Sequence, residues 1–374
     1  MPSNLILHRV GARLWIGRIM VTWAIIAGLT AFVRTPWEFY GMRLLLGLAE
    51  AGFIPGAVYY LSQWFPSSRR GRIFGIFYLS LAGSGLVGGP LSGAVLAAMS
   101  GWLGLAGWKW LLLVEALPSL LIGVLVILLL PERPQGAPWL TEAEQRHVAD
   151  TLARDQAGQD GMPAAALWRS PVIWLLVVVY LLLNYAAYGL SFWLPTLVQG
   201  FGVEGALQIG LLSALPSLCS MVCMVLFGIS ADRHGERRWH LTAMFLIGAS
   251  GFVISVLSGG TLVVGLGGLC LAAVCTQAFP SLFWAVPTRL LSGVAAAAGL
   301  AMINALGNLS GFFGPYAVGL LRENTGSTVA AVYSLAAALF ASAALVHLLP
   351  SRLIDRAGAA RAVPRAAVPG GRAP

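Results

Sequence analysis

The sequence predicts an all-α integral membrane protein with many spanning helices, and two observations support this. Of the 374 residues, 58% are hydrophobic and only 10% are charged, and the mean hydropathy is +0.81. A typical soluble domain carries about 25% charged residues, so a chain this poor in charge cannot cover a water-facing surface. The apolar residues also gather in long runs, near the roughly 20 residues that a helix needs to cross a bilayer.

Ten apolar runs are long enough to be spanning helices. They cover about residues 16–34, 40–64, 73–99, 108–131, 171–199, 207–230, 240–258, 261–285, 295–321 and 329–350. The chain therefore divides into a first bundle (1–131), a polar central loop (132–170), a second bundle (171–350) and a tail (351–374). The tail is rich in Arg, Ala, Pro and Gly, which predicts disorder.

Basic residues predict the orientation of these helices. Nineteen of the 23 Lys and Arg residues stand on one side of the predicted membrane, in alternate loops or at adjoining helix ends. The positive-inside rule makes that side cytoplasmic, so the central loop and the C-terminus are expected in the cytoplasm. The basic residues form short clusters between apolar runs, which argues against nucleic-acid binding despite the net charge of +9. We expect a multi-pass protein of the inner (plasma) membrane, surrounded by lipid and acting as a monomer.

The chain repeats itself. Residues 228–239 align with residues 4–15 at a constant offset of 224, with Arg, Gly, Arg and Trp matching. Gly89-Pro90 and Gly314-Pro315 repeat at an offset of 225. These landmarks predict two homologous halves joined by the central loop, and two parallel repeats with a site between them are typical of transporters.

At these residues the chain resembles the major facilitator superfamily. Residues 228–238 are similar to that superfamily's cytoplasmic loop motif, G-x-x-x-D-R-x-G-x-R-R. Further segments resemble its anion:cation symporter family, in particular the bacterial aromatic and dicarboxylic acid permeases; they cover residues 2–13, 43–56, 188–196, 236–240 and 304–316. The resemblance extends over residues 1–350 and implies a fold of two pseudo-symmetric helical bundles.

The resemblance begins only at the cytoplasmic end of the family's second helix. The family's first helix, which carries an Asp-Arg pair near the binding site, has no counterpart in these 374 residues. The first bundle is therefore expected to be incomplete. Either the true start lies upstream or the chain is a degraded copy, and the intact remainder favours an upstream start.

Arg43 and Glu50 are charged residues inside one predicted span, where a charge costs about 2.5–3.5 kcal/mol at the helix centre. Seven residues rotate a helix by about 700° and advance it by about 10.5 Å, so both side chains share a face. Arg43 is a permanent cation that can bind a substrate carboxylate. Desolvation favours the protonated form of Glu50 and makes it a candidate proton carrier. The resemblance implies the same two roles; the alternative is that each residue makes a structural ion pair.

Polar residues at helical spacing in the second half are candidates for the rest of a substrate site. Asn184 and Tyr188 are four residues apart, as are Asn304 and Asn308. Amide and phenol groups can bind a carboxylate or a hydroxyl without bringing a fixed charge. The alternative is that they hold neighbouring helices together. For Glu115, a structural role and protonation both remain open.

The cytoplasmic loop motif predicts a conformational latch. Asp232, facing a helix N-terminus or an arginine, would hold the helices in one conformation and release them in the other. The residues assigned to the latch in both halves are Arg9, Gly11, Arg13, Asp232, Arg233, Gly235, Arg237 and Arg238. In the first-half copy His8 stands where the acid is expected, so that latch should be weaker or different. The alternative is that the basic residues only fix the topology.

The sequence predicts a secondary active transporter rather than an enzyme, since it shows no Walker motif, zincin pair or Ser-His-Asp order. We expect proton-coupled uptake of a small organic anion, such as an aromatic or dicarboxylic acid, by alternating access. No cofactor is expected, and the proton gradient is the expected energy source. Two alternatives remain: a proton-coupled antiporter that exports drugs or metabolites, suggested by the glycine-rich run at 83–93, and a truncated, non-transporting relic.

Overall fold

The computed structural model describes residues 10–156, 167–234, 236–284, 286–287 and 293–350. Within these residues every regular element is a helix, which confirms the predicted all-α class. The candidate latch residues Arg9 and Gly235 and the predicted disordered tail, 351–374, lie outside the described residues. The chain forms two compact units, which are described separately: unit 1 comprises residues 1–80, 87–159 and 204–211, and unit 2 comprises 81–86, 160–203 and 212–374.

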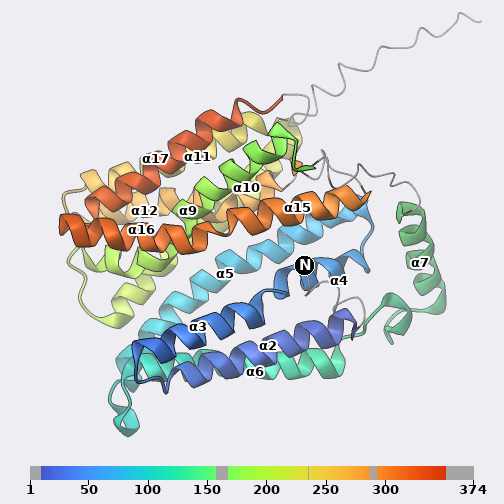
Figure 1. Cartoon of the computed structure of the whole chain (residues 1–374), viewed down its shortest axis with the longest axis horizontal. Helices are drawn as coiled ribbons and strands as arrows, with labels where there is room; N and C mark the ends of the chain where they lie inside the picture. The colour runs from blue at the N-terminus through green and yellow to red at the C-terminus, as the bar shows by residue number, and fades with distance from the viewer. Residues whose placement is uncertain (1–9, 157–166, 235, 285, 288–292, 351–374) are drawn as a thin grey trace, which may run out of the picture. The chain divides into compact units, whose positions relative to one another are not determined.

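Unit 1 is built around the pair α2 (Ala12–Thr30) and α6 (Gly107–Leu129), which lie side by side (Figure 1). Glycines allow this close contact, because a Cβ atom added at Gly17 would lie 2.3 Å from Ile127 Cγ1. Helix α2 also packs against α3 (Pro36–Glu50) and α4 (Phe53–Ser62). The remaining elements are α5 (Ser67–Met99), η1 (Trp102–Gly104), η2 (Pro134–Gly136) and the polar helix α7 (Glu142–Gln156).

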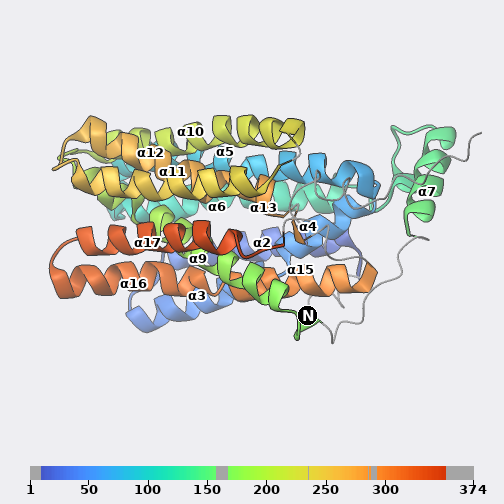
Figure 2. The ribbon, with the colours of Figure 1, turned by 90° about the horizontal axis from the view of Figure 1, so that it is seen from above.

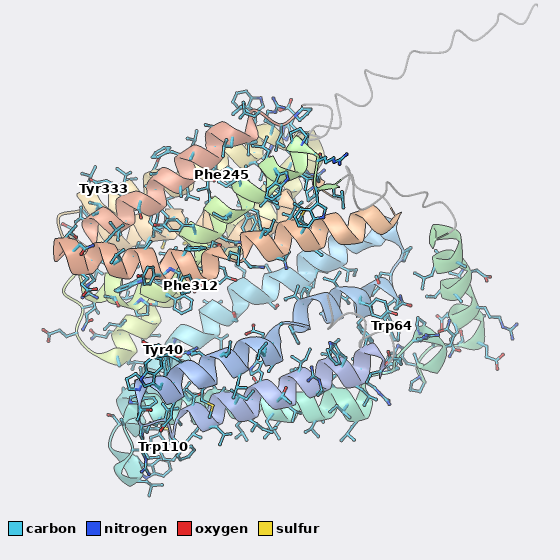
Figure 3. All side chains as sticks on the ribbon, in the orientation of Figure 1. Tyr40, Trp64, Trp110, Phe245, Phe312 and Tyr333 are labelled. Carbon is cyan, nitrogen blue, oxygen red and sulfur yellow. The ribbon has the colours of Figure 1, made fainter. Side chains whose placement is uncertain are left out.

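In unit 2, α11 (Arg238–Leu257) packs against α12 (Leu262–Ala278) and α17 (Val329–Val346). Helix α9 (Pro171–Gln199) contacts α15 (Gly293–Gly307), α16 (Ser310–Thr325) and α17 (Figure 2). The short helix α13 (Pro280–Phe283) and the long helix α10 (Ala206–His234), whose first residues belong to unit 1, complete the unit. Large buried side chains such as Phe245 (Figure 3) and Phe252 fill its interior.

Six of the described helices are long and apolar enough to cross a membrane: α2, α6, α9, α10, α11 and α17. Three predicted spans are instead broken into two helices each. The span predicted at 40–64 is divided between α3 and α4, that at 261–285 between α12 and α13, and that at 295–321 between α15 and α16.

Local sequence explains these breaks. Pro55 and Pro280 have no backbone N–H to donate four residues back, and they lie in the first turn of α4 and at the start of α13. Gly307 and Gly311 flank the third break, and glycine lowers helix stability by about 1 kcal/mol relative to alanine. Interrupted helices in a membrane are tolerated where the freed backbone groups face protein or a cavity.

Candidate functional site

A hydrogen-bonded row of tyrosines and asparagines joins α9 to the junction between α15 and α16. The hydroxyl of Tyr188 donates to Asn308 Oδ1 at 3.1 Å, and Asn308 Nδ2 donates to Asn304 Oδ1 at 3.0 Å. The hydroxyl of Tyr180 donates to the same Asn304 oxygen at 3.3 Å. We call Tyr180, Tyr188, Asn304 and Asn308 the tyrosine–asparagine ladder.

Glycines let the tyrosine rings reach the second helix. A Cβ atom added at Gly307 would lie 2.0 Å from Tyr180 Cδ1, and one added at Gly311 would lie 3.3 Å from Tyr188 Cε2. Because the glycines lie beside the ladder asparagines in sequence, the same close approach that admits the rings brings the phenols to the amides. The break at 308–309 and the ladder therefore depend on the same residues.

Asn184 lies between Tyr180 and Tyr188 on the same face of α9, four residues from each. Its side chain is only 6% exposed. Within the described part of the chain, Asn184 Nδ2 has no hydrogen-bond partner. A buried amide that is left unpaired costs about 1–3 kcal/mol, so this N–H group is a candidate for binding an acceptor that arrives from outside the protein.

Tyr180 is a candidate residue that sequence reasoning missed. It is buried, and its ring centroid lies 5.2 Å from that of Phe283, 5.1 Å from that of Trp284 and 5.7 Å from that of Phe279. From the sequence, a tyrosine in an apolar run is indistinguishable from a core side chain. The available signal was its spacing of four residues before Asn184, which extends the Asn184–Tyr188 row by one turn.

In unit 1, Arg43 and Glu50 lie on α3, and both are exposed on this unit. The Arg43 guanidinium carbon lies 4.9 Å from the centre of the Phe39 ring, a cation–π contact. Glu50 is the last residue of α3, directly before the break that leads to α4. No ion pair joins either residue to another described residue, so the structural ion pair considered as an alternative is not found among them.

The start of α3 is fixed by local sequence. Thr35 Oγ1 accepts a hydrogen bond from the Glu38 backbone N–H at 3.2 Å, and Glu38 Oε2 accepts one from the Thr35 backbone N–H at 3.4 Å. This capping box, with Pro36 at the first helical position, is a strong helix-start signal. It sets the register in which Arg43 and Glu50 share a face.

At the predicted first-half latch, an acid that the sequence motif does not include contacts the motif glycine. Gly11 precedes α2 with φ +91°, and Glu132 accepts hydrogen bonds from the backbone N–H groups of Ala12 and Arg13 at 2.5 and 3.0 Å. A Cβ atom at Gly11 would lie 2.8 Å from Glu132 Oε1. The motif glycine thus makes room for a carboxylate at the N-terminus of α2. The sequence feature that could have identified Glu132 is its position, as an acid directly after the apolar run 108–131.

The start of the central loop is held against α4. The Tyr60 hydroxyl donates to the Pro131 carbonyl at 3.1 Å, and the rings of Trp64 (Figure 3) and Trp139 stack with centroids 6.2 Å apart. Further along the loop, the backbone N–H and the hydroxyl of Thr141 donate to Glu144 and lower the pKa of its carboxyl. The loop is therefore ordered from residue 131 into α7.

At the predicted second-half latch, the corresponding elements are joined by hydrogen bonds of the opposite chemistry. Arg238, the first residue of α11, donates to the Leu349 carbonyl after α17, and Thr242 Oγ1 lies 3.1 Å from His347 Nε2. Arg233 is exposed and Arg237 is half-buried. Asp232 lies in α10, but its side chain is outside the description, so its latch role stays a prediction.

Comparison with known proteins identifies the relatives of this chain. Residues 1–315 match the sequence model of the Major Facilitator Superfamily. A Pseudomonas putida protein named as a metabolite transport protein, NicT, is 40% identical over 359 residues, covering 95% of this chain and 82% of its own length. An Agrobacterium vitis protein named for tartrate transport is 42% identical over 351 residues, covering 93% and 77%. The quinolone resistance transporter of Acinetobacter baumannii is 37% identical over 356 residues, covering 94% and 81%.

Solved structures agree with this relationship at the level of the fold. A D-xylose–proton symporter superposes with a TM-score of 0.72 at 15% identity, covering 93% of this chain and 83% of that one. A bacterial homologue of the human lysosomal transporter Spinster gives a TM-score of 0.63, also at 15% identity and with coverage of 93% and 83%. The predicted fold class is confirmed, and the chain is a multi-pass membrane transporter of small molecules rather than an enzyme. It belongs to the Major Facilitator Superfamily.

Proposed function

We propose that this protein is a proton-coupled symporter that brings a small organic anion into the cytoplasm by alternating access. The observation that carries the proposal is the pair Arg43 and Glu50. They share one face of α3, inside a predicted span, without an ion-pair partner among the described residues. Charges inside a membrane protein that are not consumed by structure mark ion and substrate pathways.

Arg43 is the proposed carboxylate-binding residue. Its guanidinium carbon lies 4.9 Å from the centre of the Phe39 ring, and a guanidinium offers a planar fork of N–H donors that matches a carboxylate. A lysine has no such planar fork, so Arg43→Lys should weaken binding of every carboxylate substrate.

Glu50 is the proposed proton carrier. It ends α3, where the helix dipole disfavours a negative charge, and it precedes the N-terminus of α4, where the dipole favours one. In the proposed cycle Glu50 takes up a proton, Arg43 binds the anion, and both are released on the cytoplasmic side.

The second half is proposed to supply neutral hydrogen-bonding groups for a substrate. Asn184 Nδ2 is a buried donor without a partner among the described residues, and it lies in the row that carries Tyr180 and Tyr188. Such N–H groups bind carboxylate or hydroxyl oxygens and bring no charge. The names of the tartrate-type relatives support a carboxylic acid, with dicarboxylic and aromatic acids as the classes to test.

Reconstituted vesicles test the proposal with L-tartrate, succinate and benzoate under an inward proton gradient. We expect accumulation of at least one acid by the wild type. Glu50→Gln should abolish gradient-driven accumulation but keep exchange of that acid across the membrane. Arg43→Lys should raise its KM at least tenfold, whereas Arg34→Lys, outside the span predicted at 40–64, should not. Unchanged accumulation by Glu50→Gln would exclude the coupling role, and unchanged affinity of Arg43→Lys would exclude the carboxylate role.

Proton-coupled export is a second candidate function, favoured by the similarity to a quinolone resistance transporter. The same vesicles distinguish the two functions. An exporter would move its substrate against the direction of proton flow, and a symporter would move it with that flow.

A further inference from the structure

An isolated carboxyl group lies in unit 1 away from α3. The hydroxyl of Ser92, on α5, donates to Glu115 Oε1, on α6, at 2.7 Å. Glu115 is eight residues after Gly107, so it lies ~12 Å along α6 from its start, and Ser92 is seven residues before Met99, ~10 Å from the end of α5. The two side chains thus meet at matching depths, inside both predicted spans.

Among the described residues, no cation forms an ion pair with Glu115. Helix α2 packs against α6, with Gly28 facing Ala116, and the sequence has no charged residue between Arg18 and Arg34. Helix α5 has none after Arg72. Lys109 precedes Glu115 by six residues, which is not a same-face spacing, and its ammonium lies 5.3 Å from the Trp108 ring centre.

A serine is a partner that serves both protonation states of a carboxyl group. Its hydroxyl donates to a carboxylate and accepts from a carboxylic acid. An arginine or lysine would instead hold the charged form. A carboxyl at membrane depth whose one hydrogen-bond partner among the described residues is a hydroxyl can therefore keep that hydrogen bond in either protonation state.

Ser92 lies in a segment of α5 that touches another helix directly through its backbone. A Cβ atom at Gly93 would lie 2.6 Å from the Ala206 carbonyl oxygen, and one at Gly210 would lie 2.3 Å from the Gly89 carbonyl oxygen. These contacts join α5 to the first turns of α10 that belong to unit 1. Because no side chains separate the two backbones at these glycines, α5 beside Ser92 is in direct contact with the first turns of α10.

We propose that Glu115 is a second proton-binding residue of this transporter and that Ser92 positions its carboxyl. The inference rests on the proposed proton coupling and deepens it, because it adds one proton per transport cycle to the proton carried by Glu50. Glu50 lies 14 residues after Pro36, ~21 Å along α3, so Glu115 is the carboxyl nearer to the outer ends of the helices in the proposed orientation.

The first experiment needs no substrate. The purified full chain is treated with N,N′-dicyclohexylcarbodiimide, which modifies protonated carboxyl groups in membranes, and the label at Glu115 is quantified by mass spectrometry from weakly acidic to weakly alkaline buffer. We expect labelling that falls as pH rises. In Ser92→Ala the labelling should persist into more alkaline buffer, whereas Ser80→Ala, whose hydroxyl bonds within α5 to Phe77, should match the wild type. Absent or pH-independent labelling of Glu115 would overturn the inference.

The second experiment counts protons and L-tartrate entering vesicles together. Glu115→Gln should transport one proton fewer per anion than the wild type, with Glu115→Asp restoring the wild-type ratio. If the wild type couples protons and Glu115→Gln keeps the same number of protons per anion, this inference is refuted but the proposed function is not. A wild type that couples no protons to any acid would refute the proposed function, whatever the labelling shows.

Discussion

At the residue scale, glycines decide which polar groups meet in this protein. Gly11 has a positive φ and lies against the Glu132 carboxylate, and Gly307 lies against the Tyr180 ring. In both places a side chain would displace the group that makes the hydrogen bond. The polar contacts at the predicted latch and in the ladder therefore depend on neighbours that have no side chain.

Glu132→Ala should destabilise unit 1. It removes the acceptor of two backbone N–H groups at the N-terminus of α2, and loss of an N-terminal cap costs about 1 kcal/mol. Thermal unfolding of the purified protein measures the effect. Glu142→Ala is the matched control, since Glu142 makes an exposed ion pair with Arg146 one turn away on α7 and such pairs contribute about 0–1 kcal/mol. Equal effects of the two variants would contradict the capping role of Glu132.

Gly307→Ala should destabilise unit 2 more than Gly319→Ala. The added methyl would overlap the Tyr180 ring at Gly307, but at Gly319 it would lie 3.6 Å from Trp193, an ordinary contact. Overpacking of this kind costs about 1–3 kcal/mol. A double-mutant cycle measures the coupling between the two residues. It compares the melting temperatures of the wild type, Gly307→Ala, Tyr180→Ala and the double variant. Additive effects would show that the two residues do not compete for one space.

At the element scale, the broken spans are the feature that hydropathy could not reveal. The apolar runs located the helices, because lipid contact requires apolar side chains along a whole span. They did not reveal the breaks, since one proline such as Pro55 or Pro280 hardly changes the average over 20 residues. The spacing of Asn184 and Tyr188 identified them as candidates. It could not predict their contacts, because packing fixes the register of α9 against α15 and α16.

Glu132 shows the same limit at the predicted latch. The motif covers residues 8–13, within one loop. The carboxylate that contacts α2 comes from a position more than a hundred residues later. A sequence motif records local spacing, and tertiary contacts between the two ends of a bundle are not local. Prediction was thus strongest for elements and weakest for partners.

Tyr188→Phe tests whether the ladder between helices serves transport as well as packing. The variant loses the hydroxyl that donates to Asn308, and hydrogen bonds between membrane helices contribute about 0.6 kcal/mol on average. We expect a small loss of stability but a several-fold rise in KM for the transported acid. Tyr333→Phe is the control, since Tyr333 (Figure 3) is 40% exposed on α17. A loss of stability with an unchanged KM would show that the ladder has only a structural role.

At the scale of the whole molecule, the internal repeat is preserved in position but not in chemistry. Each unit ties the start of one helix to the segment that follows another: α2 to Glu132 after α6, and α11 to Leu349 after α17. In unit 1 a side-chain acceptor meets backbone donors, and in unit 2 a side-chain donor meets a backbone acceptor. The repeated halves therefore place equivalent contacts at the ends where the basic residues gather.

Those basic residues make the orientation testable with single cysteines. In a background where Cys219, Cys223 and Cys270 are serine and the fully buried Cys275 is alanine, one variant carries Ala143→Cys on α7 and another carries Asn324→Cys at the end of α16. Both positions are exposed. A membrane-impermeant maleimide should label Asn324→Cys in intact cells and Ala143→Cys only after permeabilisation, because Ala143 lies in the basic central loop. The reverse labelling pattern would contradict the predicted orientation. It would also contradict the placement of Glu115 nearer to the outer side.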